Sequence, residues 1–281
     1  MSSLQMPALA QPPQVTWTAL PDDFVLPDDP VENIQQHPLA AALTDALGAA
    51  QRLRPEMLVG ANFALVATVN RESVVKAPDW FYVPRVQPVT DLVRRSYTQN
   101  LQGDRVAIVM EFLSASDNGE LSVRSTPPYG KLYFYEHILQ VPTYVIYDPG
   151  AIALEVRCLE NQRYIVQTPD AAGRFWIPEL NLFLGLWQGE RLAQTMHWLR
   201  WWDEAGNLLL WSSEQAEQER QRAEQERQRA EQERQRAEQA VQQVAQERQR
   251  AEQERQRAER LAALLRAQGI DPDSAAGTNS D

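Results

Sequence analysis

Three ionisable side chains stand in otherwise apolar surroundings in the first half of the sequence. Asp79 follows a proline in Lys-Ala-Pro-Asp-Trp, Glu111 lies in Val-Met-Glu-Phe-Leu-Ser, and Lys131 lies in Tyr-Gly-Lys-Leu-Tyr. A buried, ionised carboxylate needs a partner, so two carboxylates on neighbouring strands indicate a shared cation. Magnesium typically takes one or two carboxylates and leaves its other positions to water and phosphate. A lysine nearby can help to deprotonate an attacking water and offset charge that develops on phosphorus.

The segments around the two carboxylates have the patterns of β-strands. Arg105–Leu113, which contains Glu111, is apolar at nearly every position. Such a run predicts a strand buried on both faces, at the centre of a mixed sheet that helices cover. Leu58–Val69 and Val74–Val83 are also rich in Val, Phe and Ala, and Asn70–Ser73 predicts a turn between them. We therefore expect both carboxylates on neighbouring strands of one sheet.

Helices are predicted before and after these strands in the chain. Residues 39–50 are rich in Ala and Leu, with an apolar stripe at helical spacing, and residues 129–139, which carry Lys131, suit a second helix. A short buried strand at 143–147 follows, and residues 153–211 show hairpin-like strands separated by turn signals. Together these elements predict an α/β core with a central mixed sheet flanked by helices and with extra C-terminal β-hairpins.

The last quarter of the chain changes character. The unit Ala-Glu-Gln-Glu-Arg-Gln-Arg begins at residues 216, 223, 230 and 251, and almost all of its residues are strong helix formers. Glu precedes Arg by three positions, a spacing that stabilises an isolated helix by about 0.2–0.5 kcal/mol per pair. A coiled coil needs apolar residues at two positions per heptad, whereas the middle of this segment offers one small one. The repeat predicts a long charged helix that acts either as a spacer or in self-association through a coiled coil.

Composition and charge exclude several classes of protein. The single cysteine, Cys158, excludes a disulfide framework and a multi-cysteine metal site, and the three histidines form no HExxH motif. The formal net charge is −11. The repeat helix balances twelve Glu against twelve Arg and the last 13 residues hold three Asp, so residues 1–213 hold 15 basic and 23 acidic side chains. A body this acidic repels phosphate backbones unless a local basic cleft overrides its field.

The sequence also bears on targeting. The first basic residue is Arg52, so the chain has neither a basic signal-peptide n-region nor an arginine-rich transit peptide. No stretch approaches the roughly 18 apolar residues that a membrane helix needs. We expect a cytoplasmic protein with no membrane partner.

Four motifs in order resemble those of the Uma2 family. They are Pro78–Asp79, Val109–Ser114, Lys131-x-x-x-Tyr135 and Val141–Pro149, and the resemblance covers residues 31–212. Uma2 proteins are restriction-endonuclease-like members of the PD-(D/E)XK nuclease superfamily, and the Glu/Arg-rich tail is a further similarity. The resemblance implies a restriction-endonuclease-like core in which Asp, Glu and Lys gather around Mg²⁺ and hydrolyse a phosphodiester of DNA.

The resemblance also implies a set of metal ligands. Asp79 and Glu111 would hold Mg²⁺ or Mn²⁺, and the backbone carbonyl of Phe112 would be a third ligand. Family members often carry an acidic residue before the first helix, and Glu32 is the nearest candidate for this accessory position.

The catalytic lysine departs from the pattern of the superfamily, which places it two residues after the glutamate. That position is Leu113 here. The family resemblance implies that the following helix supplies the lysine instead, as Lys131, which would activate the nucleophile or stabilise the pentacovalent charge.

The sequence thus predicts four regions and leaves two functions open. The regions are a Pro-rich flexible arm (1–30), a restriction-endonuclease-like domain (31–212), a heptad-repeat helix (213–268) and a disordered C-terminus (269–281). The first function is a Mg²⁺-dependent DNA endonuclease. The alternative is a catalytically silent interaction module, in which Glu111 and a lysine form a buried ion pair without catalysis.

Overall fold

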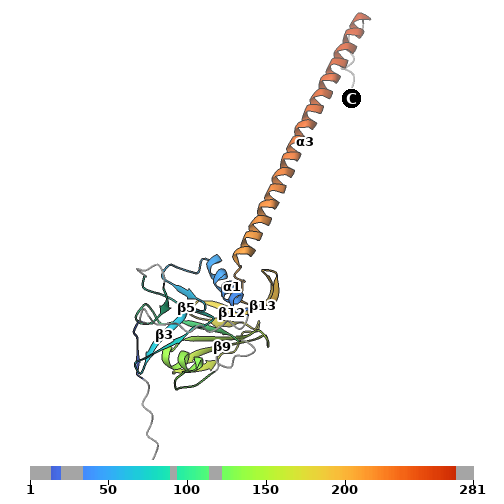
Figure 1. Ribbon diagram of the computed structural model, residues 1–281. Coiled ribbons are helices and arrows are strands. Elements are labelled where there is room, and N and C mark those ends of the chain that lie inside the picture. Colours follow the sequence, from blue (N-terminus) through green and yellow to red (C-terminus); the bar gives the residue numbers. More distant parts are fainter. Residues whose placement is uncertain (1–13, 20–33, 89–93, 114–121, 270–281) are drawn as a thin grey trace, which may run out of the picture. The chain divides into compact units, whose positions relative to one another are not determined.

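The computed structural model describes residues 14–19, 34–88, 94–113 and 122–269 (Figure 1). The chain forms two compact units, one that extends to Gln215 and one that begins at Ala216. The first unit is mixed α/β, and the described part of the second is almost entirely helix, so the predicted fold class is confirmed.

A six-stranded mixed sheet forms the centre of the first unit. Its strand order is β10-β9-β8-β7-β5-β2, and β7 and β8 are parallel whereas every other neighbouring pair is antiparallel. The strands are β2 (Leu58–Gly60), β5 (Trp80–Val83), β7 (Ile108–Phe112), β8 (Thr143–Asp148), β9 (Ala153–Glu160) and β10 (Arg163–Val166). All five residues of β7 are buried, as the apolar run around Glu111 predicts for a central strand.

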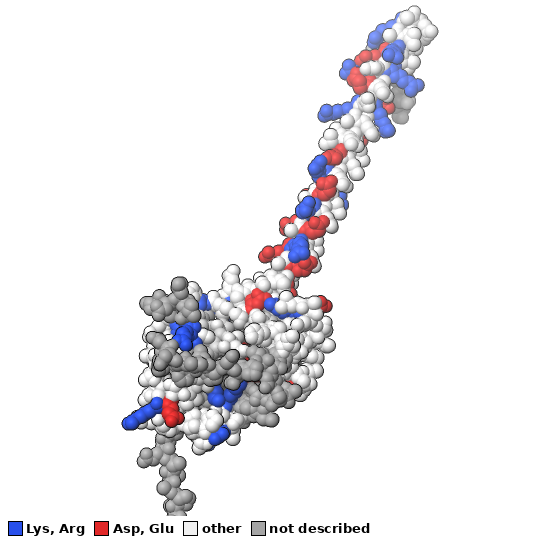
Figure 2. Space-filling model, viewed as in Figure 1, with Lys and Arg blue, Asp and Glu red and all other residues white. Residues whose placement is uncertain are grey.

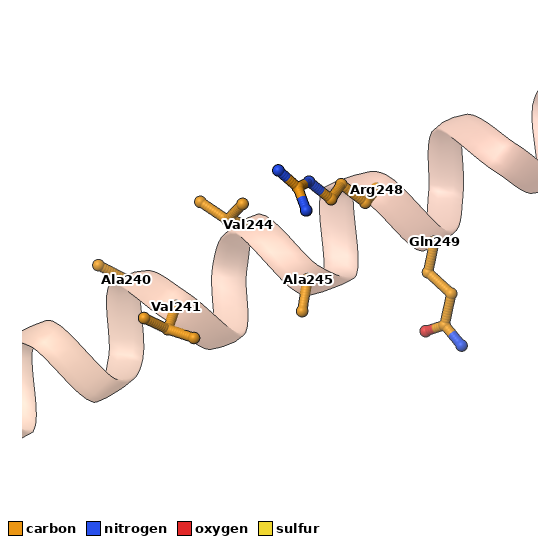
Figure 3. Close-up of a pocket in the computed structure, with 6 residues that line it drawn as sticks. All are labelled: Ala240, Val241, Val244, Ala245, Arg248 and Gln249. Carbon is orange, nitrogen blue, oxygen red and sulfur yellow. The ribbon is translucent and has the colours of Figure 1, made fainter.

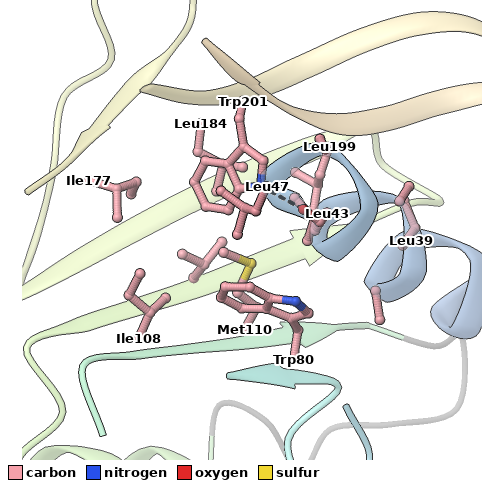
Figure 4. Packing of buried hydrophobic residues seen from close by; sticks show 14 of the residues in the cluster. Leu39, Leu43, Leu47, Trp80, Ile108, Met110, Ile177, Leu184, Leu199 and Trp201 are labelled. Carbon is pink, nitrogen blue, oxygen red and sulfur yellow. Dashed lines mark hydrogen bonds between the residues drawn. The ribbon is translucent and has the colours of Figure 1, made fainter. Parts of the chain in front are cut away.

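One face of this sheet packs against helix α1 (Gln36–Ala49) and a three-stranded sheet (Figure 4). The three-stranded sheet consists of β11 (Phe175–Ile177), β12 (Leu182–Arg191) and β13 (Gln194–Trp202). Helix α1 contributes Leu39, Leu43 and Leu47, which helical spacing aligns in one stripe, and all three are fully buried. Truncating a buried leucine of this kind typically costs about 2–5 kcal/mol, so α1 is firmly held against the sheet.

The opposite face carries the alternate residues of the same strands. Since successive side chains of a strand point to opposite faces, Phe81 and Val109 lie here whereas Trp80 and Met110 face α1. The covering elements are α2 (Lys131–Tyr133), which continues directly into the π-helix η1 (Phe134–Leu139), and a small sheet. That sheet pairs β3 (Ala64–Val69) with β4 (Glu72–Lys76), β1 (Val15–Thr16) and β6 (Ser96–Tyr97).

Two segments predicted as single strands are each divided between the two sheets. The predicted strand 58–69 forms β2 and β3, and the predicted strand 74–83 forms β4 and β5. The first segment passes from the central sheet to the small one and the second passes back, at the same corner, where the Asn62 N–H donates to the Pro78 carbonyl (2.9 Å). Pro78 has no N–H to offer a ladder, and Asn62 has a left-handed φ of 50°, so neither position continues a regular strand. Periodicity does not reveal this break because both halves of each segment are apolar.

The second unit contains most of helix α3 (Ser212–Ala267), in which no residue is buried. Acidic and basic side chains alternate along it in Figure 2, and ion pairs such as Arg234–Glu238 (3.2 Å) join residues four apart. Its first turn belongs to the first unit, where the buried guanidinium of Arg200 pairs with Glu214 (2.6 Å). Among the helices of the described residues, none combines the length and apolarity that a membrane span requires.

Candidate active site

The strand register places Asp79 and Glu111 beside each other. In the antiparallel pair β5–β7, Trp80 lies opposite Met110 and Phe81 opposite Val109. Continuing this register by one residue sets Asp79 opposite Glu111, on the face that carries Phe81 and Val109. Side chains directly opposite each other in an antiparallel pair have Cβ atoms about 4.5–5.5 Å apart, close enough to act on one ligand.

Glu111 is fully buried and both of its carboxylate oxygens are hydrogen-bonded. The Lys131 ammonium lies 3.2 Å from Oε2, and the Tyr135 hydroxyl donates to Oε1 at 2.8 Å. Lys131 begins α2 and Tyr135 follows four residues later in η1, so helical spacing directs both side chains at the same strand residue. The lysine expected on the helix after the strand therefore does reach the glutamate.

Burial raises the pKa of Glu111 to about 7, above its usual value of 4.5. The Lys131 ammonium opposes this shift, the nearby Asp79 carboxylate adds to it, and hydrogen bonds from Tyr135 and Lys131 lower the pKa again. Burial also raises the pKa of Tyr135 well above its usual range, so its hydroxyl stays protonated and donates. Burial and the Asp79 carboxylate thus favour the neutral form of Glu111, whereas the Lys131 ammonium favours its charged form.

The backbone of Phe112 connects this pair to helix α1. Its N–H donates to Asp79 Oδ2 at 2.6 Å, which fixes the carboxylate against β7. Its carbonyl, the predicted third metal ligand, accepts a hydrogen bond from Gln36 Nε2 at 2.9 Å. A carbonyl oxygen has two lone pairs, so this bond leaves one for another partner.

Gln36 is a site residue that the sequence analysis misses. It precedes the apolar stripe of α1, so the helical pattern does not distinguish it from the other polar residues before Leu39. The predicted accessory residue, Glu32, lies outside the described residues. Within them, Gln36 is the residue of the first helix that reaches the site.

The donor set suits magnesium better than a transition metal. Asp79, Glu111 and the Phe112 carbonyl offer only oxygen atoms, the ligands that Mg²⁺ and Mn²⁺ prefer. No group of three or more His, Cys, Asp or Glu side chains able to hold a metal occurs in the part of the chain that the structure describes. Magnesium needs no such group, because it keeps several waters and binds through one or two carboxylates. The residues present therefore fit the metal that the family resemblance implies.

A comparison with protein families identifies the family of the chain. A model of the Uma2 family, whose description is "Putative restriction endonuclease", matches residues 5–194. The chain belongs to the Uma2 family. Among curated protein sequences, none matches it significantly.

The Uma2 match includes every strand of the central sheet, helix α1 and the Asp79, Glu111 and Lys131 side chains, and it ends before α3. Membership implies a restriction-endonuclease-like nuclease. In this Uma2 protein Leu113 occupies the position two residues after the glutamate, and its N–H bonds to the Tyr147 carbonyl in continuation of the sheet. The positively charged group next to Glu111 is instead the Lys131 ammonium, which comes from helix α2 and not from the strand.

Proposed function

We propose that this Uma2 protein is a Mg²⁺-dependent DNA endonuclease that hydrolyses phosphodiester bonds at the site of Asp79, Glu111 and Lys131. The observation that carries the proposal is the position of the Lys131 ammonium, 3.2 Å from a buried glutamate whose strand register places it opposite Asp79. Two carboxylates and one lysine on a shared sheet face are the groups that hydrolysis of a phosphodiester needs.

The metal ligands in this proposal are Asp79, Glu111 and the Phe112 carbonyl. Bound there, Mg²⁺ or Mn²⁺ supplies a Lewis acid that polarises the phosphate and favours deprotonation of an attacking water. The Phe112 N–H holds Asp79 in place, and Tyr135 holds Glu111, so neither carboxylate has to reorganise when the substrate binds.

Lys131 has the access to solvent that a catalytic lysine needs. Its side chain is 24 % exposed whereas that of Glu111 is fully buried, so the ammonium lies between the buried carboxylate and the solvent. From this position it can orient an attacking water, accept or return its proton, and offset charge on the phosphate oxygens.

The substrate that we propose is DNA, on the strength of family membership and of the site's chemistry. The net negative charge of residues 1–213 weakens long-range attraction to DNA. Binding should therefore depend on short-range contacts near the site and on the metal, and it should show a shallow dependence on salt.

The test is cleavage of supercoiled and single-stranded DNA by the purified full chain with Mg²⁺ or Mn²⁺, beside Glu111→Ala and Lys131→Ala. We expect cleavage by the wild type that chelation abolishes and that both variants lose while they retain their circular dichroism. Absence of metal-dependent cleavage by the wild type on either substrate would contradict the proposal. Equal cleavage by wild type and variants would also contradict the assigned site.

One observation favours the alternative of a catalytically silent module. The Glu111–Lys131 ion pair already compensates part of the buried charge without any metal. In that case Lys131→Met would unfold the protein or lower its stability strongly, whereas added Mg²⁺ would leave the melting temperature unchanged.

We also propose that the tail self-associates. Val241 and Val244 lie on α3 at 70 % and 50 % exposure, next to Ala240 and Ala245, and together they form a small apolar patch (Figure 3). The patch is exposed within its own unit, so the simplest partner that would bury it is the tail of a second copy of this chain. Sedimentation velocity of the wild type and of Val241→Lys, Val244→Lys should then show a dimer that the double variant dissociates.

A further inference from the structure

A groove of about 490 Å³ opens beside Asp79, between helix α1 and the edge strand β2. Its size falls within the roughly 300–1,000 Å³ that is typical of small-molecule sites. Helix α1 lines one wall, and β2 with the loop after it lines the other. Asp79 lines this groove and also belongs to the candidate active site, so whatever fills the groove lies next to a proposed metal ligand.

The lining has no positive charge to hold a phosphate. Among the described residues that line the groove, none is Lys or Arg, and two, Asp45 and Asp79, carry carboxylates. Its apolar surface comes from Ala40, Ala41 and Val59. A phosphate is therefore disfavoured, whereas an uncharged group with an apolar face and polar edges is favoured.

Two polar side chains of the groove are available to such a group. Within the described residues, the His37 imidazole and the Asn62 amide take part in no side-chain hydrogen bond, and both residues are exposed. Thr44, by contrast, is occupied, because it accepts the Trp80 indole N–H (3.0 Å) and donates to the Ala40 carbonyl (3.1 Å). His37 can stack on a planar ring, and the amide of Asn62 offers both a donor and acceptors.

We propose that this groove binds the base and sugar of the nucleotide next to the scissile phosphate, and that the substrate is consequently single-stranded or locally unpaired DNA. The proposal rests on the proposed nuclease function. A base inside a duplex is stacked on both faces and paired at its edge, so it cannot enter a groove lined by α1 unless it leaves the stack. An unpaired strand presents its bases without that cost, and stacking contacts bind the face of a base with little sequence preference.

The test uses a variant that fills the groove and a matched control. Ala41 is exposed on the groove wall, so Ala41→Trp blocks the space without disturbing the core, and Ala172→Trp places the same side chain in an exposed turn outside it. Binding of a fluorescent single-stranded oligonucleotide to the full chain is measured by anisotropy in Ca²⁺. We expect the wild type to bind this strand about tenfold more tightly than a blunt duplex of the same sequence, and Ala41→Trp to lose about tenfold. Ala172→Trp should bind as the wild type does.

A second variant, His37→Ala, removes a polar contact without adding bulk and should weaken single-strand binding by about threefold. Equal binding by Ala41→Trp and the wild type, or equal binding of duplex and single strand, would overturn the inference. The proposed function is tested separately by cleavage. If Glu111→Ala abolishes metal-dependent cleavage while Ala41→Trp binds and cleaves normally, the nuclease proposal stands and only the groove assignment fails.

Discussion

The Lys131 ammonium lies 3.2 Å from Glu111 Oε2, although the two residues are twenty positions apart and belong to a helix and a strand. The central strand β7 buries the carboxylate, and the first turn of α2 brings the ammonium over it. Glu111 lies inside the sheet, Lys131 extends from it toward solvent, and Asp79 lies beside this ion pair. The lysine that compensates the buried charge is therefore the one to which we assign the catalytic role in the proposed reaction.

Replacing Lys131 with Met tests its proposed catalytic role. The methionine keeps the length and the apolar contacts of the side chain and removes the charge. We expect DNA cleavage to fall by about 10²–10⁴-fold, the range for loss of a proton-transfer group. Single-turnover cleavage with saturating Mg²⁺ measures this, and Arg52→Met, at an exposed position after α1, is the control. An unchanged rate in Lys131→Met would show that this lysine is no part of the reaction.

Tyr135 tunes Glu111 through its hydroxyl. Tyr135→Phe removes the hydrogen bond to Oε1, one of the interactions that lower the pKa of Glu111. The pKa of Glu111 should therefore rise further, and Mn²⁺ binding measured by calorimetry should need a higher pH, by up to about one unit.

The control for that shift is Tyr164→Phe. The Tyr164 hydroxyl also donates a hydrogen bond, to the Val141 carbonyl at 3.0 Å, but not to the carboxylates. Both variants should lose about 1–3 kcal/mol of unfolding free energy for a buried hydrogen bond. Only Tyr135→Phe should move the pH dependence of metal binding, and a shift of the same size in Tyr164→Phe would refute the specific role of Tyr135.

Sequence reasoning anticipates the strand residue of this site but only part of its geometry. Glu111 is recognisable because a single charge interrupts an apolar run, which requires a buried partner. The register that sets Asp79 opposite Glu111 depends on the corner at Pro78. A single sequence does not show that the chain changes from one sheet to the other at this corner. Tyr135 was within reach, since it lies four residues after Lys131 on a predicted helix. Gln36 was not, since its role depends on a carbonyl 76 residues away.

The buried Glu111 carboxyl should make stability depend on pH. Its pKa is about 7 in the folded protein and near 4.5 when unfolded, so between these values the folded state holds more protons. Stability then decreases as pH rises from 4.5 to 7, by an amount on the order of 3 kcal/mol without metal. Glu111→Gln removes this dependence.

Urea unfolding of both proteins at pH 5 and pH 8, in EDTA, measures the effect. We expect the wild type to lose stability relative to Glu111→Gln between the two values. Saturating Mg²⁺ at pH 8 should restore the wild type and leave Glu111→Gln unchanged. The same difference between the two proteins at both pH values would be incompatible with a carboxyl that ionises near pH 7.

The two members of the partly buried Arg200–Glu214 ion pair should contribute unequally to the free energy of unfolding. The Arg200 guanidinium is fully buried, makes two hydrogen bonds to Glu214 (3.1 and 2.6 Å) and lies 3.4 Å from the centre of the Trp211 ring. Glu214→Gln leaves that charge buried and unpaired, so we expect a loss of about 3–5 kcal/mol. Arg200→Met fills the same space without a charge and should cost less.

Tryptophan fluorescence during urea unfolding measures both variants, because Trp211 contacts the guanidinium directly. Glu217→Gln, one turn further along the exposed part of α3, is the control and should change stability by less than about 0.5 kcal/mol. A larger loss in Arg200→Met than in Glu214→Gln would contradict this view of the pair.

The most direct test of the metal site is an anomalous difference map from crystals of the full chain grown with Mn²⁺. The site described here predicts one strong peak within coordination distance of the Asp79 and Glu111 carboxylates and the Phe112 carbonyl, and no such peak in crystals of Glu111→Gln. Ordered crystals with saturating Mn²⁺ and no density between these two carboxylates would contradict a metal-dependent nuclease site in this protein.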